Sequence, residues 1–375
     1  MNNDAISSYD FTKIPFDRIV KLGQRTMLYR DMFTVSWLLG RYCNYNCSYC
    51  WPYARSNTRD YRPLELNLLT MDEIKRQSRE RGYNSFHFSF SGGEPTVYPD
   101  YLKLLTHYVS DTANCNYQSV HMTTNMSQGI KWFSRYTETT KDLNRVSVTA
   151  SWHREQGIKQ GDLKGHTEQF ADKLVFLQEN DVQVTVNTVM VPAWFDMLYE
   201  EAEYFLSRGI NVTLKPQSDP TASKVVTGYT DEQLAILHNG MPQRNFTAVK
   251  SRVDRPKPKQ SMSQMSIDRG DDATVPQVMQ VEFEDDAGVK WYMDQAERFN
   301  AFNFNNFKGW NCESGFRSII IREPDGAIKR SYSCSDKPLG YIETGFKLFG
   351  TPMPCISDAC VSSADSKIPK YRDAK

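Results

Sequence analysis

The sequence predicts an α/β protein: a partial (β/α)6 barrel of parallel strands followed by a small β-rich C-terminal extension. Short β-branched runs alternate with helical segments, which is typical of parallel βα units. At 375 residues the chain exceeds the usual limit of one core, which favours a large domain with an appendage. Six units give an open barrel, and chemistry in such barrels lies at the carboxyl ends of the strands.

The barrel strands are predicted from six short runs rich in β-branched and aromatic residues. These runs are Thr34–Gly40, Ser85–Phe90, Ser119–Thr123, Arg145–Ser151, Val182–Val189 and Asn211–Leu214. Between them, apolar residues recur at helical spacing in Met71–Arg81, Tyr101–Thr112, His166–Glu179 and Trp194–Arg208. Beyond the barrel, turn residues within apolar runs predict two hairpins, Gln280–Met293 and Ser318–Ser333.

Changes in composition divide the chain into four predicted parts. These are an N-terminal extension (1–30), the barrel (31–217), a linker or lid-like segment (218–275) and the β-rich domain (276–375). Within the third part, Arg252–Gln264 has almost no apolar content and two prolines, so we expect a loop or lid there.

Composition excludes several classes of protein. The 45 basic and 45 acidic residues cancel, so no basic surface indicates nucleic-acid binding. No long apolar run indicates a membrane span, and the N-terminus lacks a secretory signal, so a cytoplasmic protein is expected. Eight cysteines in a chain of this length then favour metal ligation over disulfides.

The most informative motif contains Cys43, Cys47 and Cys50 in the order C-x3-C-x2-C, directly after the first predicted strand. Three thiolates cannot close a site that takes four ligands, so an iron–sulfur cluster held this way keeps one iron open. A zinc ribbon or a disulfide is the alternative, although no fourth cysteine or histidine lies nearby at zinc spacing.

A second motif, Ser91-Gly92-Gly93-Glu94-Pro95, follows the next predicted strand. Glycines there let the backbone approach a ligand closely, although a glycine pair alone is compatible with an ordinary turn. Taken with the cysteine motif and its Tyr49, this placement resembles the radical S-adenosylmethionine superfamily over roughly residues 34–216.

The resemblance implies a [4Fe-4S] cluster on the three cysteines, whose open iron chelates S-adenosylmethionine, and a 5′-deoxyadenosyl radical that abstracts hydrogen from a substrate. Implied cofactor contacts are Gly92, Gly93, Glu94, Thr124, Asn125 and Ser151. For the last two residues, helix caps or turns are the alternative explanation. His153 and Lys215 are the catalytic candidates, with a structural histidine and a solvated lysine as alternatives, and Asn187 is expected near the barrel mouth.

Four further cysteines, Cys312, Cys334, Cys355 and Cys360, lie in the last 64 residues. Their arrangement around a hairpin resembles the SPASM/Twitch extensions, which carry auxiliary [4Fe-4S] clusters. Four ligands suffice for one closed cluster, which favours the shorter Twitch-like form and a role as electron relay or scaffold. Their spacing departs from the usual pattern, and structural zinc or free thiols are the alternatives.

Three functions therefore remain open. Only 42 residues precede Cys43, too few for the N-terminal peptide-recognition domain of many relatives, so a small-molecule substrate is favoured over a peptide. The alternatives are a maturase acting on a precursor peptide and a non-catalytic iron–sulfur protein, against which the intact Gly92–Pro95 motif speaks. An electron donor such as flavodoxin or ferredoxin is the expected partner.

Overall fold

A computed structural model describes residues 10–28, 31–51, 54–221, 224–242, 275, 279–294, 296–322, 325–334 and 336–373. The expected lid at 252–264 lies outside these residues. Among the described helices, none is both long and apolar enough to cross a membrane.

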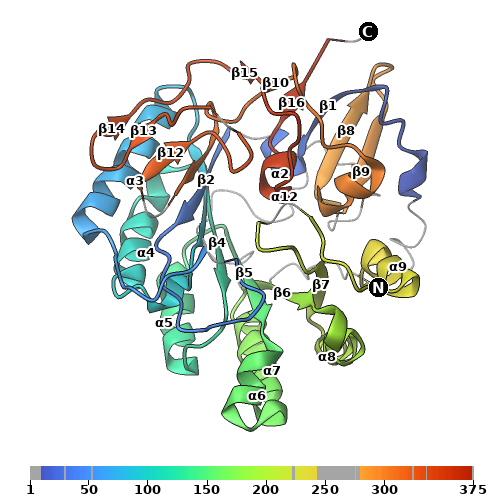
Figure 1. Cartoon of the computed structure of the whole chain (residues 1–375). Coiled ribbons are helices and arrows are strands. Elements are labelled where there is room, and N and C mark those ends of the chain that lie inside the picture. The colour runs from blue at the N-terminus through green and yellow to red at the C-terminus, as the bar shows by residue number, and fades with distance from the viewer. Residues whose placement is uncertain are drawn as a thin grey trace.

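The six predicted barrel strands are all present, and they are neighbours in one parallel series (Figure 1). The α/β fold with a parallel sheet is therefore confirmed. The strands are β2 (Met32–Leu38), β3 (Ser85–Ser91), β4 (Tyr117–Thr124), β5 (Arg145–Trp152), β6 (Gln183–Met190) and β7 (Asn211–Pro216).

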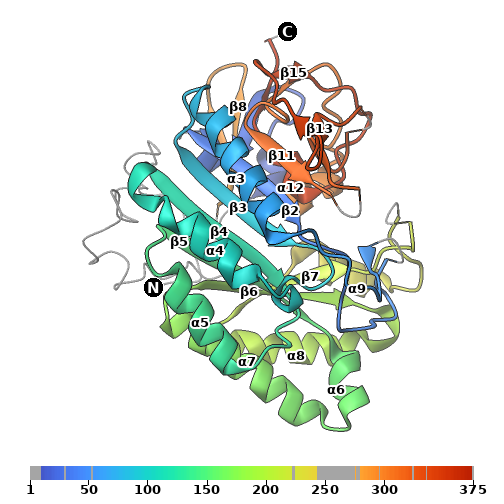
Figure 2. The same ribbon diagram turned by 90° about the vertical axis from the view of Figure 1, so that its left-hand side faces the viewer.

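Helices cover the outer face of this sheet (Figures 1 and 2). They are α3 (Leu64–Arg79), α4 (Tyr101–Ser110), α5 (Ile130–Thr140), α6 (Arg154–Gln160), α7 (Leu163–Glu179) and α8 (Phe195–Ser207), with α9 (Asp231–Asn239) following β7. Helices α5, α6 and α9 were not predicted from the sequence. The predicted start of α3 at Met71 is too late, because the helix starts directly after Pro63, a residue suited to a helix start.

The outward side chains of the strands form the main core. In β3, Phe86, Phe88 and Phe90 are fully buried. The ring of Phe88 lies 4.9 Å from that of Tyr108, and the ring of Phe90 lies 5.6 Å from that of Tyr101, both on α4. Because every second residue of a strand faces outward, the residues between them face the barrel interior.

A second sheet combines both ends of the chain. Its strand pairs are antiparallel, and the strand order is β15-β10-β16-β1-β8-β9. The predicted hairpin within Gln280–Met293 is confirmed as β8 and β9. The strands are β1 (Ile19–Gln24), β8 (Val281–Asp285), β9 (Lys290–Met293), β10 (Asn311–Cys312), β15 (Met353–Pro354) and β16 (Lys370–Tyr371), and the short helix α2 (Arg25–Leu28) follows β1.

The second predicted hairpin, β11 (Ser318–Ile321) and β12 (Ala327–Lys329), is also present. β11 runs parallel to β2 and extends the barrel sheet beyond its expected edge. β13 (Gly340–Tyr341) and β14 (Gly345–Phe346) continue this edge, and the helix α12 (Ser363–Ser366) follows later in the chain. The C-terminal region thus contributes to both sheets.

Candidate active site

The cysteine loop follows the carboxyl end of β2. Cys47 is buried, Cys43 is partly exposed and Cys50 is exposed. Within the loop, the Cys50 N–H donates to the Cys47 carbonyl at 3.2 Å, and the Tyr45 N–H lies 3.4 Å from the Cys43 Sγ. Burial raises the pKa of Cys43 to about 11 and that of Cys47 to about 12, because an uncompensated buried thiolate is costly.

The glycine motif packs directly against this loop. The Gly93 N–H donates to the Gly40 carbonyl at 2.8 Å, and the Glu94 N–H donates to the Tyr42 carbonyl at 2.8 Å. A Cβ on Gly93 would lie 2.1 Å from the Tyr42 oxygen, and one on Gly92 would lie 2.3 Å from the Gly40 oxygen. Only glycine permits this approach of two backbones, so the motif seats the cysteine loop at the end of the barrel.

Glu94 joins the glycine motif to the end of β4. Its buried carboxylate accepts hydrogen bonds from the Thr124 hydroxyl at 2.7 Å, from the Asn125 N–H at 2.6 Å and from Thr96. Burial raises the pKa of Glu94, and these hydrogen bonds oppose the rise. The carboxylate therefore holds two strand ends in one arrangement.

The other strand-end candidates differ in their surroundings. The Asn125 amide donates to the Asn44 side-chain oxygen at 3.0 Å and lies 3.8 Å from the Cys43 Sγ, so it contacts the cysteine loop. The Thr124 hydroxyl is used by Glu94. Ser151, near the end of β5, pairs in register with Asn187 of β6 and is partly exposed.

His153 also lies against the cysteine loop. Its Nδ1 is 2.8 Å from the Tyr49 hydroxyl, and the two rings stack with their centroids 5.9 Å apart. Burial lowers the pKa of His153 to about 4, so the imidazole is neutral near pH 7. The aromatic residue that precedes Cys50 thus serves as a packing and hydrogen-bonding surface for His153.

Two residues of α6 that were not predicted from the sequence also support the loop. Glu155 accepts hydrogen bonds from both the N–H, at 2.9 Å, and the hydroxyl of Ser48. The Lys159 ammonium donates to the Asn46 carbonyl at 3.0 Å. Their spacing of four residues places both on one helix face, the only signal that sequence offered for them.

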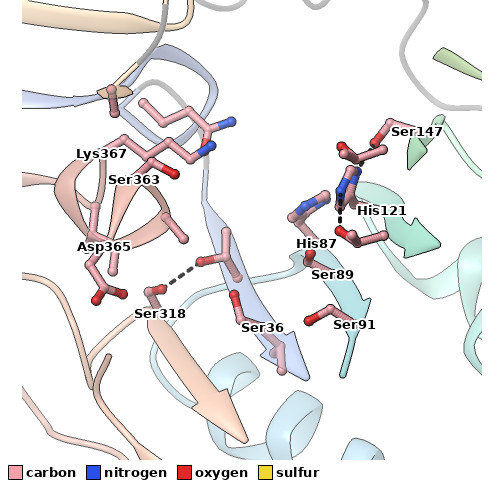
Figure 3. A pocket seen from close by; sticks show the side chains of 18 of the residues that line it. Ser36, His87, Ser89, Ser91, His121, Ser147, Ser318, Ser363, Asp365 and Lys367 are labelled. Atoms are coloured by element: carbon pink, nitrogen blue, oxygen red, sulfur yellow. Dashed lines mark hydrogen bonds between the residues drawn. The ribbon is translucent and has the colours of Figure 1, made fainter. Parts of the chain in front are cut away.

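The barrel encloses a polar cavity of about 390 Å³ (Figure 3). Its walls are the inward residues of seven strands together with the segment around α12. Asn187 and Lys215 line this cavity, whereas His153 lies at the cysteine loop. Hydroxyl, amide and imidazole groups are the commonest among the polar side chains that these seven strands contribute. The polar side chains are Thr34, Ser36, His87, Ser89, Ser91, His121, Thr123, Arg145, Ser147, Thr149, Gln183, Thr185, Asn187, Thr213, Lys215 and Ser318.

The C-terminal cysteines gather at one end of the second sheet. Cys312 ends β10, and Cys355 follows β15, which pairs with β10. Burial raises the pKa of Cys360 to about 12, and the nearby Cys312 adds to the rise. Burial likewise raises the pKa of Cys334, where Cys312 again contributes. Cys312 is thus an electrostatic neighbour of two other cysteines.

In the part of the chain that the structure describes, no three His, Cys, Asp or Glu side chains converge as the ligands of a single metal ion. An iron–sulfur cluster imposes a different geometry, because each thiolate binds a separate iron.

Comparison with known proteins identifies the barrel. Residues 37–203, less than half of the chain, match the model of the Radical SAM superfamily. A solved structure of hexahistidine-tagged anSMEcpe with bound AdoMet is 13% identical, with a TM-score of 0.50, and the match covers 84% of this chain and 79% of that one. Native anSMEcpe with bound AdoMet and Kp18Cys peptide is also 13% identical over the same shares, with a TM-score of 0.49.

At this identity the likeness shows the fold alone. No curated protein matches the sequence. The radical SAM fold implies a [4Fe-4S] cluster and S-adenosylmethionine as cofactors.

Proposed function

We propose that this protein is a radical S-adenosylmethionine enzyme that abstracts hydrogen from a small polar molecule. The observation that carries the proposal is the cysteine loop, which is held by the Gly92-Gly93-Glu94 segment at the end of a barrel with a polar interior. Cys43, Cys47 and Cys50 would hold the cluster. When bound, the cluster and S-adenosylmethionine supply an adenosyl radical able to attack an unactivated C–H bond.

Both the donor set and the cradle fit these cofactors. Three thiols in one short loop would leave one iron of a cluster open. The glycine pair lets the backbone before the first cysteine pack directly on the end of β3. Buried polar atoms near the loop, the Ser127 Oγ and the Gln156 Nε2, lack a hydrogen-bond partner among the described residues. Such atoms are suited to a polar cofactor, because burial without a partner is costly.

The other residues around the cysteine loop hold the thiols in position and shield them from water. Glu94, Asn125 and Glu155 fix the loop through hydrogen bonds, so the thiols stay in place while the substrate binds. His153 stays neutral and packs on Tyr49, where it limits access of water. Lys215 and Ser151 are the residues we assign to polar contacts at the mouth.

Replacing Cys43, Cys47 and Cys50 together by Ala tests the proposal. After anaerobic reconstitution and addition of dithionite and S-adenosylmethionine, the wild-type protein should release 5′-deoxyadenosine, measured by chromatography. The triple variant should release none and retain about four irons at the C-terminal cysteines. Cys115→Ala is the matched control, because this buried thiol donates to the Asp111 carbonyl far from the loop.

Cleavage by the triple variant would contradict the assignment of the cluster. A wild-type protein with full iron that forms no 5′-deoxyadenosine would favour the non-catalytic iron–sulfur protein.

A second [4Fe-4S] cluster on Cys312, Cys334, Cys355 and Cys360 is part of the proposal, as electron relay or scaffold. Its support is the pairing of β10 with β15 and the packing of the Cys334 loop, where the Ser357 hydroxyl donates to the Ser333 carbonyl at 3.2 Å. Cys334→Ala should lower the amount of bound iron, measured by iron analysis after reconstitution. It should also block substrate turnover, measured by product analysis. Unchanged iron would remove the second cluster.

The polar barrel supports a small-molecule substrate rather than a precursor peptide, since the segment around α12 lines one side of the cavity. A flavodoxin or ferredoxin is the electron donor we propose. Product analysis after turnover with candidate substrates, beside a leader-peptide pulldown, separates the two substrate classes.

A further inference from the structure

The deep part of the barrel cavity, toward the amino ends of the strands, has no role in the chemistry proposed above. Two rows of inward side chains cross it. In the first row His87 pairs with Ser119, which pairs with Arg145. The row above it contains His121, Ser147 and Gln183, paired in the same way.

Each histidine is tied to the neighbouring strand by a serine. The His87 Nδ1 lies 2.8 Å from the Ser119 Oγ, and the His121 Nδ1 lies 3.0 Å from the Ser147 Oγ. Burial lowers the pKa of His87 well below its usual range and lowers that of His121 to about 3, and the positive charges of Arg145 and Lys367 add to both shifts. Both rings are therefore neutral near pH 7 and lie close to two cations.

The charges around the cavity are unbalanced. Asp365 is the one acidic side chain among the described residues that line it, and its carboxylate accepts the Ser333 N–H at 2.8 Å. The cations that line it are Arg145, Lys215, Arg330 and Lys367. Arg330 pairs with Asp336 at 3.1 Å, whereas the Arg145 Nε donates to the neutral amide oxygen of Gln183 at 2.7 Å.

We propose that this deep end binds an anionic group, a carboxylate or a phosphate, of the small polar substrate. Arg145 and Lys367 would supply the charge, and the neighbouring imidazoles and serines would supply hydrogen bonds, which are strengthened when one partner is charged. Figure 3 shows Lys367 and the two histidines around one cavity. The assignment rests on the proposed function and names its substrate class.

The distance between the deep end and the cysteine loop suggests how this site would position a substrate. Ser91, at the end of β3, lies four residues beyond His87, which corresponds to about 13 Å along an extended strand. An anionic group fixed at the deep end would therefore hold the rest of an elongated substrate toward the cysteine loop. Such positioning from a remote group is a common source of reactive alignment.

Calorimetric titration of the full-length reconstituted protein, with S-adenosylmethionine but no reductant, tests the site. Inorganic phosphate and succinate are the anionic probes, and glycerol is the neutral one. We expect at least one anion to bind, glycerol not to bind, and the tighter anion to indicate which group the substrate carries. Arg145→Gln and Lys367→Gln should each weaken anion binding about tenfold or more, the effect of losing one charged hydrogen bond.

Lys141→Gln is the control, because Lys141 is an exposed lysine paired with Glu138 on the outer surface. The two test residues lie on different elements, so misfolding of one variant, checked by thermal unfolding, leaves the other to decide. The proposed site would be wrong if the wild-type protein bound no anion, or if both variants folded and bound the anion as tightly as the wild-type protein.

Because the titration needs no reductant, it is independent of radical chemistry. Anion binding without 5′-deoxyadenosine formation would remove the proposed function and keep the site. Formation of 5′-deoxyadenosine without anion binding would do the reverse.

Discussion

The two ends of the barrel are built in different ways. At the carboxyl end, the cysteines that we propose as cluster ligands come from one contiguous loop, Cys43–Cys50, which neighbouring loops hold by backbone contacts. At the deep end, the polar residues come one or two at a time from separate strands and from the segment after α12. Local sequence therefore specifies the first end, whereas only strand register assembles the second.

Packing also separates the two ends. The glycine motif and the cysteine loop are in backbone contact, so a side chain added at either glycine would overlap backbone atoms. The deep end keeps a cavity, and its distinctive property is charge close to neutral imidazoles. We therefore expect steric substitutions to act most strongly at the loop end, and anions to act at the deep end.

The largest effect is expected from Gly93→Ala. Its Cβ would lie 2.1 Å from the Tyr42 oxygen and 2.4 Å from the Arg41 oxygen, so the cysteine loop must move. Overpacking of this kind costs about 1–3 kcal/mol or more of unfolding free energy. Urea unfolding should show that loss, and reconstitution should leave iron only at the C-terminal cysteines.

Gly350→Ala is the matched control for this prediction, because a Cβ there meets no atom within 4 Å. Its stability should change by no more than about 0.5 kcal/mol, as is usual for surface substitutions. If Gly93→Ala kept both full iron and wild-type stability, the two ends of the barrel would not differ in steric tolerance.

The fold was largely predictable because its strongest signals are local. Six β-branched runs with helical segments between them determine the parallel series, and each predicted strand lies within about two residues of its position in the structure. The pairing of β11 with β2 was not predictable, since a hairpin does not reveal which sheet edge it joins.

The parts of the candidate site that are contiguous in the sequence were predictable, and the parts that come from distant segments were not. Cys43, Cys47, Cys50 and the glycine motif follow strands directly, whereas Glu155 contacts Ser48 across 107 positions. The deep end did carry a signal, the alternation of polar and apolar residues in β3 and β5. Interpreting it requires knowledge of which face is inward, and a usual barrel interior is packed with branched apolar side chains.

A smaller effect at the deep end is a dependence of stability on pH through His121. Unfolded histidine takes up a proton near pH 6.5, whereas burial and the charges of Lys367 and Arg145 hold the folded pKa at about 3. Between these values the unfolded state binds more protons, so stability falls as the pH falls. One such group contributes a slope of about 1.4 kcal/mol per pH unit in this window.

His121→Gln should remove that contribution, which urea unfolding at pH 7, 6 and 5 would measure as a shallower loss of stability than in the wild-type protein. Above pH 6.5 the two proteins should show the same slope, since His121 is then neutral in both states. Phosphate bound near Arg145 would raise the folded pKa of His121 and flatten the wild-type slope as well. Parallel curves for the wild-type and variant proteins below pH 6.5 would mean that the imidazole is not held neutral there, and the electrostatic contrast between the two ends would fail.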